Sequence, residues 1–194
     1  MRKSMSIMSV VVLCFAMLTG CGSASSSISV VSREEGSGTR GAFVELFEIE
    51  KKDASGNKVD HTTSEAVTIS STSVMMTTVA GNEAAIGYIS LGSLNDTAKA
   101  VKIDGVDATV DNIKNGTYSI SRPFNLVTKE DISAPAKDFM NFIFSAQGQK
   151  VVEENGYIPN DGAQDYIADT TAAGKVVVAG SSSVTPVMEK IKEA

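Results

Sequence analysis

The sequence is poor in the residues on which most catalytic and metal sites depend. It has one histidine, no tryptophan and two cysteines, Cys14 and Cys21, both near the N-terminus. This composition excludes most zinc sites, histidine-dependent nucleophile triads and a disulfide framework. The net charge is −6 and no basic tract is present, so nucleic acid is not expected as a partner. Any chemistry must rest on hydroxyls, backbone amides, Arg or Lys side chains and carboxylates.

The first residues have the pattern of a bacterial export signal. Arg2 and Lys3 precede an apolar run over residues 7–18, which is too short to span about 30 Å of hydrocarbon. The run closes with Leu-Thr-Gly and then Cys21, which resembles the lipobox of bacterial lipoproteins. We expect a signal peptide over residues 1–20, followed by a lipidated (palmitate-bearing) Cys21 and a serine-rich tether over residues 21–27. The alternative is an ordinary secretory signal with an incidental cysteine.

The full chain is 42% apolar and 21% charged, as in globular proteins. Apolar periodicity and turn residues predict strands that alternate with helices, which is typical of an α/β fold. Strands are predicted for residues 28–32, 67–70, 84–89, 100–103, 124–128 and 175–179. Helices are predicted for residues 42–47, 74–79, 111–115, 136–144, 151–154 and 186–194. Residues 51–64 are predicted to form a loop.

Residues 32–40 carry the clearest chemical signal in the sequence. Glycines and hydroxyl residues lie between a predicted strand and a helix start, an arrangement in which backbone N–H groups and the helix dipole attract an anion. Arg33 adds a planar, two-toothed donor, and Glu35 is placed to pair with it. The alternative is a glycine-rich turn with helix caps and a surface arginine. The candidate anion-binding residues in this run are Arg33, Ser37, Gly38 and Thr39.

A second hydroxyl-rich turn occurs near the end of the chain, over residues 179–186. It has the same order of predicted strand, glycine, hydroxyl donors and helix start, with Ser182 and Ser183 as candidate donors. The two turns could face one anion, or this turn could serve only as an N-cap. The spacing fits neither a Walker loop nor a nucleophile elbow, because Gly38 precedes Thr-Arg and Ser37 lacks glycines two positions away.

The sequence contains four further informative stretches: SREEGSGTRGAF (32–43), AIGYISLG (85–92), SRPF (121–124) and AQGQK (146–150). In this order they resemble the second half of the phosphate-binding lipoproteins of bacterial phosphate ABC importers. The resemblance covers residues 28–160 and implies an α/β fold, a two-lobed periplasmic-binding-protein-like clamp with phosphate between its lobes. It implies phosphate contacts at Arg33, Ser37, Gly38 and Thr39, with Glu35 orienting the arginine.

The order of the segments departs from that family. The turn over residues 179–186 resembles the family's N-terminal phosphate loop, with Ser182 and Ser183 at the contact positions, yet it follows the second half. This is the order of a circular permutation, with residues 161–174 as a linker and residues 175–194 as the start of the N-terminal segment. The family's next ligands, a serine turn and an aspartate, are expected beyond residue 194. We therefore expect an incomplete clamp and a truncated chain.

The resemblance implies a solute-binding protein that is lipid-anchored on the outer face of the cytoplasmic membrane. It would capture inorganic phosphate and deliver it to the permease subunits of an ABC importer, without catalysis, cofactor or metal. One alternative is a receptor for another oxyanion, sulfate or molybdate. Another is a cell-surface signalling or adhesion module that kept the fold and lost binding. A phosphoester hydrolase with Ser37 as nucleophile finds little support, because no histidine or metal-ligand cluster accompanies it.

Overall fold

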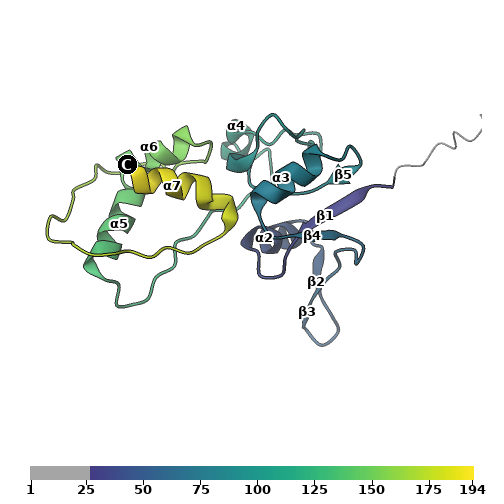
Figure 1. Cartoon of the computed structure of the whole chain (residues 1–194), viewed down its shortest axis with the longest axis horizontal. Helices are drawn as coiled ribbons and strands as arrows, with labels where there is room; N and C mark the ends of the chain where they lie inside the picture. The colour runs from purple at the N-terminus through teal and green to yellow at the C-terminus, as the bar shows by residue number, and fades with distance from the viewer. Residues whose placement is uncertain (1–26) are drawn as a thin grey trace, which may run out of the picture.

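The computed structural model describes residues 27–194, so the predicted signal peptide and Cys21 lie outside the described residues. The described elements form two groups, a small sheet with its helices and a cluster of three helices, which irregular segments connect (Figure 1). The three strands of the small sheet are separated along the chain by helices, as the sequence predicts, but an unpredicted hairpin follows the first of these helices. No helix in residues 27–194 is long and apolar enough to cross a bilayer.

The sheet of the first group is built around strand β1 (Ser29–Arg33). Strand β4 (Val67–Ile69) pairs with one edge of β1 and strand β5 (Ala85–Ile86) with the other, both in parallel. The β-branched residues of β1 favour this extended backbone, and Val31 is buried opposite Val67. Because parallel strands end at the same edge of a sheet, the turns that follow β1 and β4 meet there.

A helix follows each of these two turns directly. Helix α2 (Gly38–Leu46) comes after β1, and helix α3 (Thr72–Ala80) comes after β4. In both cases the serine before the helix, Ser37 or Ser71, accepts a hydrogen bond from the backbone amide three residues later. The N-termini of two helices therefore lie at one edge of the sheet.

The second group consists of helices α5 (Ala134–Phe144), α6 (Ala146–Glu154) and α7 (Thr185–Glu193). They pack together at one side of Figure 1, and the short helix η2 (Ser182–Val184) directly precedes α7. Amphipathic faces of these helices enclose an apolar core. The buried residues of that core are Ile143, Tyr157, Val187 and Ile191.

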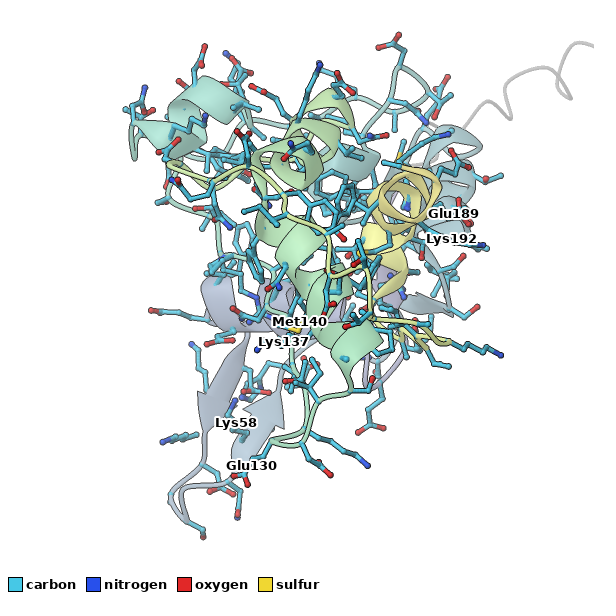
Figure 2. The ribbon with its side chains drawn as sticks, turned by 90° about the vertical axis from the view of Figure 1, so that its left-hand side faces the viewer. Lys58, Glu130, Lys137, Met140, Glu189 and Lys192 are labelled. Carbon is cyan, nitrogen blue, oxygen red and sulfur yellow. The ribbon has the colours of Figure 1, made fainter. Side chains whose placement is uncertain are left out.

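Four smaller elements complete the described chain. Strands β2 and β3 form an antiparallel hairpin that projects away from the rest of the molecule (Figures 1 and 2). Figure 2 labels Lys58 on this hairpin, and Glu189 and Lys192 on α7. The bounds of the four elements are Glu50–Lys52 for β2, Lys58–Asp60 for β3, Leu91–Ser93 for η1 and Val110–Lys114 for α4.

The hairpin shows that the predicted loop over residues 51–64 was wrong. Its turn contains Gly56, whose positive φ of 85° a glycine adopts without strain. The Asp53 carboxylate accepts hydrogen bonds from the amides of Ser55 and Asn57 and stabilises the same turn. A polar sequence therefore forms strands here because its turn is specified locally.

Three predicted strands are absent from the described residues. Residues 124–128 and 175–179 are irregular, and residues 100–103 contribute only an isolated bridge between Ile103 and Val106. Val127 and Val177 are 91% and 81% exposed and have no neighbouring strand. A β-branched run becomes a strand only where another strand supplies hydrogen-bond partners, and a local pattern does not report that partner.

The junction between α5 and α6 depends on a close approach of the backbone at Gly148. A Cβ atom added there would overlap the carbonyl oxygen of Phe142 and lie 2.7 Å from that of Ile143. The turn is fixed by Ser145, whose hydroxyl accepts a hydrogen bond from the Gly148 amide. The small residue therefore allows the two helices to meet at this angle.

We expect Gly148→Ala to lower the free energy of unfolding by about 2–3 kcal/mol, because the backbone must shift to admit the methyl group. Gly41→Ala is the matched control, since a Cβ at that helical position meets nothing within 4 Å. It should leave stability unchanged or raise it by up to about 1 kcal/mol through helix propensity. Urea unfolding followed by circular dichroism measures both, and equal midpoints for the two variants would contradict the packing described.

Candidate anion-binding site

Arg33 ends strand β1 and is the most deeply buried charged group of the described chain, at 3% exposure. Its Nε and Nη2 atoms donate to the two carboxylate oxygens of Glu34 at 2.8 and 2.9 Å. Nη2 also donates to the backbone oxygen of Ser70 at 3.4 Å, and Nη1 donates to Thr72 Oγ1 at 3.5 Å. The hydrogen bond from Arg33 lowers the pKa of Glu34. The guanidinium group is thereby fixed between the turns that follow β1 and β4.

The predicted pairing of Arg33 with Glu35 was wrong, because Glu34 forms the ion pair. A residue two positions along lies on the same face only while a strand continues. Strand β1 ends at Arg33, and the chain turns at Glu35 and Gly36, where φ is +82°. Glu35 is exposed and does not form this ion pair.

The N-terminus of α2 lies against the serine-rich turn from the other end of the chain. Thr39 Oγ1 and Ser181 Oγ are 3.2 Å apart and share a hydrogen bond. A Cβ atom at Gly38 would lie 3.7 Å from the Cβ atom of Ser181, so the two backbones run close together. Ser37 accepts the Arg40 amide at 3.3 Å as the helix cap. The two hydroxyl turns found in the sequence therefore meet in the structure.

A third hydroxyl turn, before α3, joins them. The Thr72 amide donates to Ser182 Oγ at 3.3 Å, and the two side-chain oxygens are 3.2 Å apart. In the sequence, the hydroxyl residues before this helix are typical of ordinary helix caps. The signal that could have revealed more is the repeated order of strand, hydroxyl residues and helix start, which the turns containing Ser37 and Ser182 also show.

Ser183 holds the serine-rich turn to the rest of the molecule. Its side chain is 1% exposed, and its Oγ lies 2.9 Å from Ser181 Oγ. Its backbone oxygen accepts hydrogen bonds from the hydroxyls of Tyr157, Ser90 and Ser93. Residues from both groups of elements therefore hold the turn in place.

The segment after β5 holds the backbone of Arg33 as well. Tyr88 Oη lies 2.9 Å from Ser32 Oγ and accepts the Arg33 amide at 3.0 Å. The Tyr88 ring stacks on Phe43 of α2, with centroids 4.0 Å apart and planes inclined by 6°. The stretch of residues 85–92 noted in the sequence therefore supports both Arg33 and the turn at Ser183.

Arg40 connects the site to the β2–β3 hairpin. Its Nη1 donates to the backbone oxygen of Arg33 at 2.9 Å, while Nε and Nη2 donate to Asp60 Oδ2 at 3.0 and 2.7 Å. The hydrogen bond with Asp60 raises the pKa of Arg40. Burial acts to raise the pKa of Asp60, but hydrogen bonds from Thr62 and Arg40 outweigh it and lower that pKa. The pair is ionised at neutral pH.

The convergent groups are donors suited to an oxyanion. They comprise one guanidinium edge, four hydroxyls and the first turns of α2 and α3. Within residues 27–194 no three His, Cys, Asp or Glu side chains cluster as metal ligands, and His61 is exposed. The four hydroxyls belong to Thr39, Thr72, Ser181 and Ser182.

The fold and this site define a member of a known superfamily. Residues 17–147 match the PBP superfamily domain, and the chain belongs to that superfamily. The α/β fold expected from the sequence is thereby confirmed. The chain is also similar to the phosphate-binding protein PstS 2 of Streptococcus agalactiae serotype V, with 61% identity over 184 residues. That match covers 92% of this chain and 62% of the relative, so the chain spans less than two thirds of the relative's length.

Solved structures agree with this comparison. A phosphate-binding protein of a phosphate ABC transporter from Streptococcus pneumoniae TIGR4 has a TM-score of 0.69 and 46% identity. The match covers 86% of this chain and 65% of that one. A putative phosphate ABC transporter substrate-binding protein with bound phosphate, from Clostridium perfringens, has a TM-score of 0.61 and 41% identity. This second structural match covers 69% of this chain and 52% of the Clostridium perfringens chain.

The lowered pKa of Asp60 makes the stability of the site pH-dependent. A carboxyl group whose pKa falls on folding contributes stability above its unfolded pKa of about 3.9, and the contribution is lost as pH falls through the folded value. We expect Asp60→Asn to cost about 1–2 kcal/mol at pH 7 and progressively less below pH 4. Asp107→Asn, which removes an exposed partner of Lys102, should cost under about 1 kcal/mol. Urea titrations at pH 7 and pH 3 measure this, and a constant Asp60→Asn effect would contradict it.

Proposed function

We propose that this chain binds inorganic phosphate and serves as the solute-binding component of a phosphate ABC importer, without catalysis. The observation that carries the proposal is the convergence of a buried guanidinium with hydroxyls from three turns that are distant in sequence. Support comes from relatives that are named as phosphate-binding proteins, one of them solved with bound phosphate. A receptor binds and releases its ligand unchanged, and a set of donors with no nucleophile–base pair suits that task.

In this proposal the nearby donors replace the hydration shell of the anion. Nη1 of Arg33 and the hydroxyls of Thr39 and Ser182 donate to phosphate oxygens. The amides of Gly38 and Thr39 belong to the first turn of α2, which offers them no intrahelical acceptor, so they donate as well. The Ser37 hydroxyl accepts the Arg40 amide and keeps its proton to donate. Ser183 contributes indirectly, because its hydroxyl forms a hydrogen bond with Ser181.

These donors would serve sulfate as well as phosphate. Phosphate carries a proton at neutral pH whereas sulfate does not, so discrimination requires an acceptor that sulfate leaves unsatisfied. Parallel titrations with the two anions therefore test the named ligand separately from the site. Equal affinity for both would turn the proposal into a general oxyanion receptor.

We also propose that Cys21 is lipidated after removal of residues 1–20, so that the protein is held at the outer face of the cytoplasmic membrane. Support comes from the apolar run over residues 7–18 and the Leu-Thr-Gly-Cys ending. Anchoring there would place the receptor beside permease subunits of the importer, to which it would deliver phosphate.

Arg33→Ala tests the phosphate site directly. We expect the dissociation constant to rise at least about thirtyfold, because loss of one partner of a desolvated charged pair costs about 2–5 kcal/mol. Arg33→Lys keeps the charge but loses the planar donor edge, so its affinity should be intermediate. Lys102→Ala removes an exposed positive charge and is the control, with binding unchanged. Isothermal titration calorimetry with phosphate measures all three, and an unaltered constant for Arg33→Ala would exclude the assignment.

Cys21→Ser tests the anchor. The variant should leave the membrane fraction, since acyl chains contribute roughly 0.8 kcal/mol per buried CH₂ and residues 22–27 are not apolar enough to replace them. Cys14→Ser is the matched control, because residue 14 lies in the predicted signal peptide. Fractionation of producing cells should find Cys14→Ser in the membrane and Cys21→Ser outside it. Membrane retention of both would show that residues 7–18 themselves anchor the chain.

A further inference from the structure

Thr72 lies where the buried guanidinium meets the serine-rich turn. Its Oγ1 is 3.5 Å from Arg33 Nη1 and 3.2 Å from Ser182 Oγ, and its amide donates to the same Ser182 oxygen at 3.3 Å. The residue is 7% exposed, so water competes little for these hydrogen bonds. Thr72 is therefore the link between two residues that the proposed function assigns to phosphate.

Chemistry fixes the direction of two of the three hydrogen bonds at Thr72, those that an N–H group donates. A guanidinium group can only donate, so Thr72 Oγ1 accepts from Arg33. The Thr72 amide donates to Ser182 Oγ, while either oxygen of the hydroxyl pair could be the donor. When Thr72 is the donor, Ser182 Oγ receives two hydrogen bonds from one residue. A hydroxyl oxygen has two lone pairs, and both are used in this arrangement. Ser182 is left with its own proton to give and no capacity to accept.

Helix capping does not account for Thr72. The cap of α3 is Ser71, whose Oγ accepts the Val74 amide at 3.2 Å. Thr72 occupies the first position of the helix, and its hydroxyl contacts Arg33 and Ser182 rather than the backbone of its own helix. The side chain is therefore free to act on the site.

We propose that Thr72 is a positioning residue that turns the Ser182 hydroxyl into an obligate donor toward the oxyanion. The inference rests on the proposed phosphate function and deepens it. Ser182 then cannot accept a hydrogen bond from a P–OH group, so an unprotonated ligand oxygen is its favoured partner. Thr72 acts through Ser182 and does not itself donate a hydrogen bond to the ligand.

Phosphate titration of three variants tests the role. We expect Thr72→Val to weaken binding about tenfold, or about 1.4 kcal/mol, while Thr72→Ser, which keeps the hydroxyl, stays within about threefold of the parent. Thr77→Val makes the same change at an exposed position of the same helix and should leave affinity unaltered. Thermal melts of each variant without phosphate show whether the fold is retained. Binding by Thr72→Val that equals the parent overturns the inference.

A double-mutant cycle separates positioning from general damage. If Thr72 acts through Ser182, then Thr72→Val adds no further loss once Ser182→Ala has removed the hydroxyl. Additive losses, or a Thr72→Ser variant as weak as Thr72→Val, would overturn the inference while leaving phosphate binding intact. A folded parent chain that binds no phosphate would instead reject the proposed function, and this inference with it.

Discussion

The buried guanidinium of Arg33 is the constraint on which the site depends. An unpaired charge in a protein interior is costly, so a group that is 97% buried must be surrounded by partners. Glu34 neutralises one edge, the Ser70 carbonyl accepts from it, and Thr72 meets the remaining edge. Parallel pairing of β1 with β4 brings these partners together, because the carboxyl ends of both strands lie at one edge of the sheet. The sheet is small, yet its register places this charge.

The serine-rich turn adds a contact between distant parts of the chain. Thr39 and Ser181 are 142 positions apart in sequence and share a hydrogen bond, while Tyr157 and the Ser90 segment hold the backbone of Ser183. The turn is therefore not a free loop beside a finished site. Its position is set by the helical group on one side and by the sheet group on the other.

The sequence predicts what short-range rules govern. A glycine-rich turn with a serine cap predicts that a helix, α2, begins after it, and Pro186 predicts the start of α7. Both signals act within one helical turn, so a short stretch of sequence contains them. The contact between Arg33 and Glu34 could not be foreseen, since it depends on where β1 ends. The strand expected at residues 175–179 fails because a strand needs a partner edge that its own residues do not encode. The role of Thr72 was missed for the same reason, since its partners lie 39 and 110 positions away.

In a site made largely of hydroxyls, the direction of each hydrogen bond must be fixed by its neighbours, because a hydroxyl can either donate or accept. Three neighbouring groups can only donate to these hydroxyl oxygens: the Arg33 guanidinium and the backbone amides of Arg40 and Thr72. These donors occupy lone pairs of Thr72, Ser37 and Ser182, and in the proposed function the protons of Ser37 and Ser182 are then available to a ligand. In the proposed function, such donors would also allow a chain of net charge −6 to bind an anion. At 0.1 M salt, repulsion between the anion and carboxylates more than about 10 Å away is largely screened. Hydrogen-bond donors that touch the anion are not screened in this way.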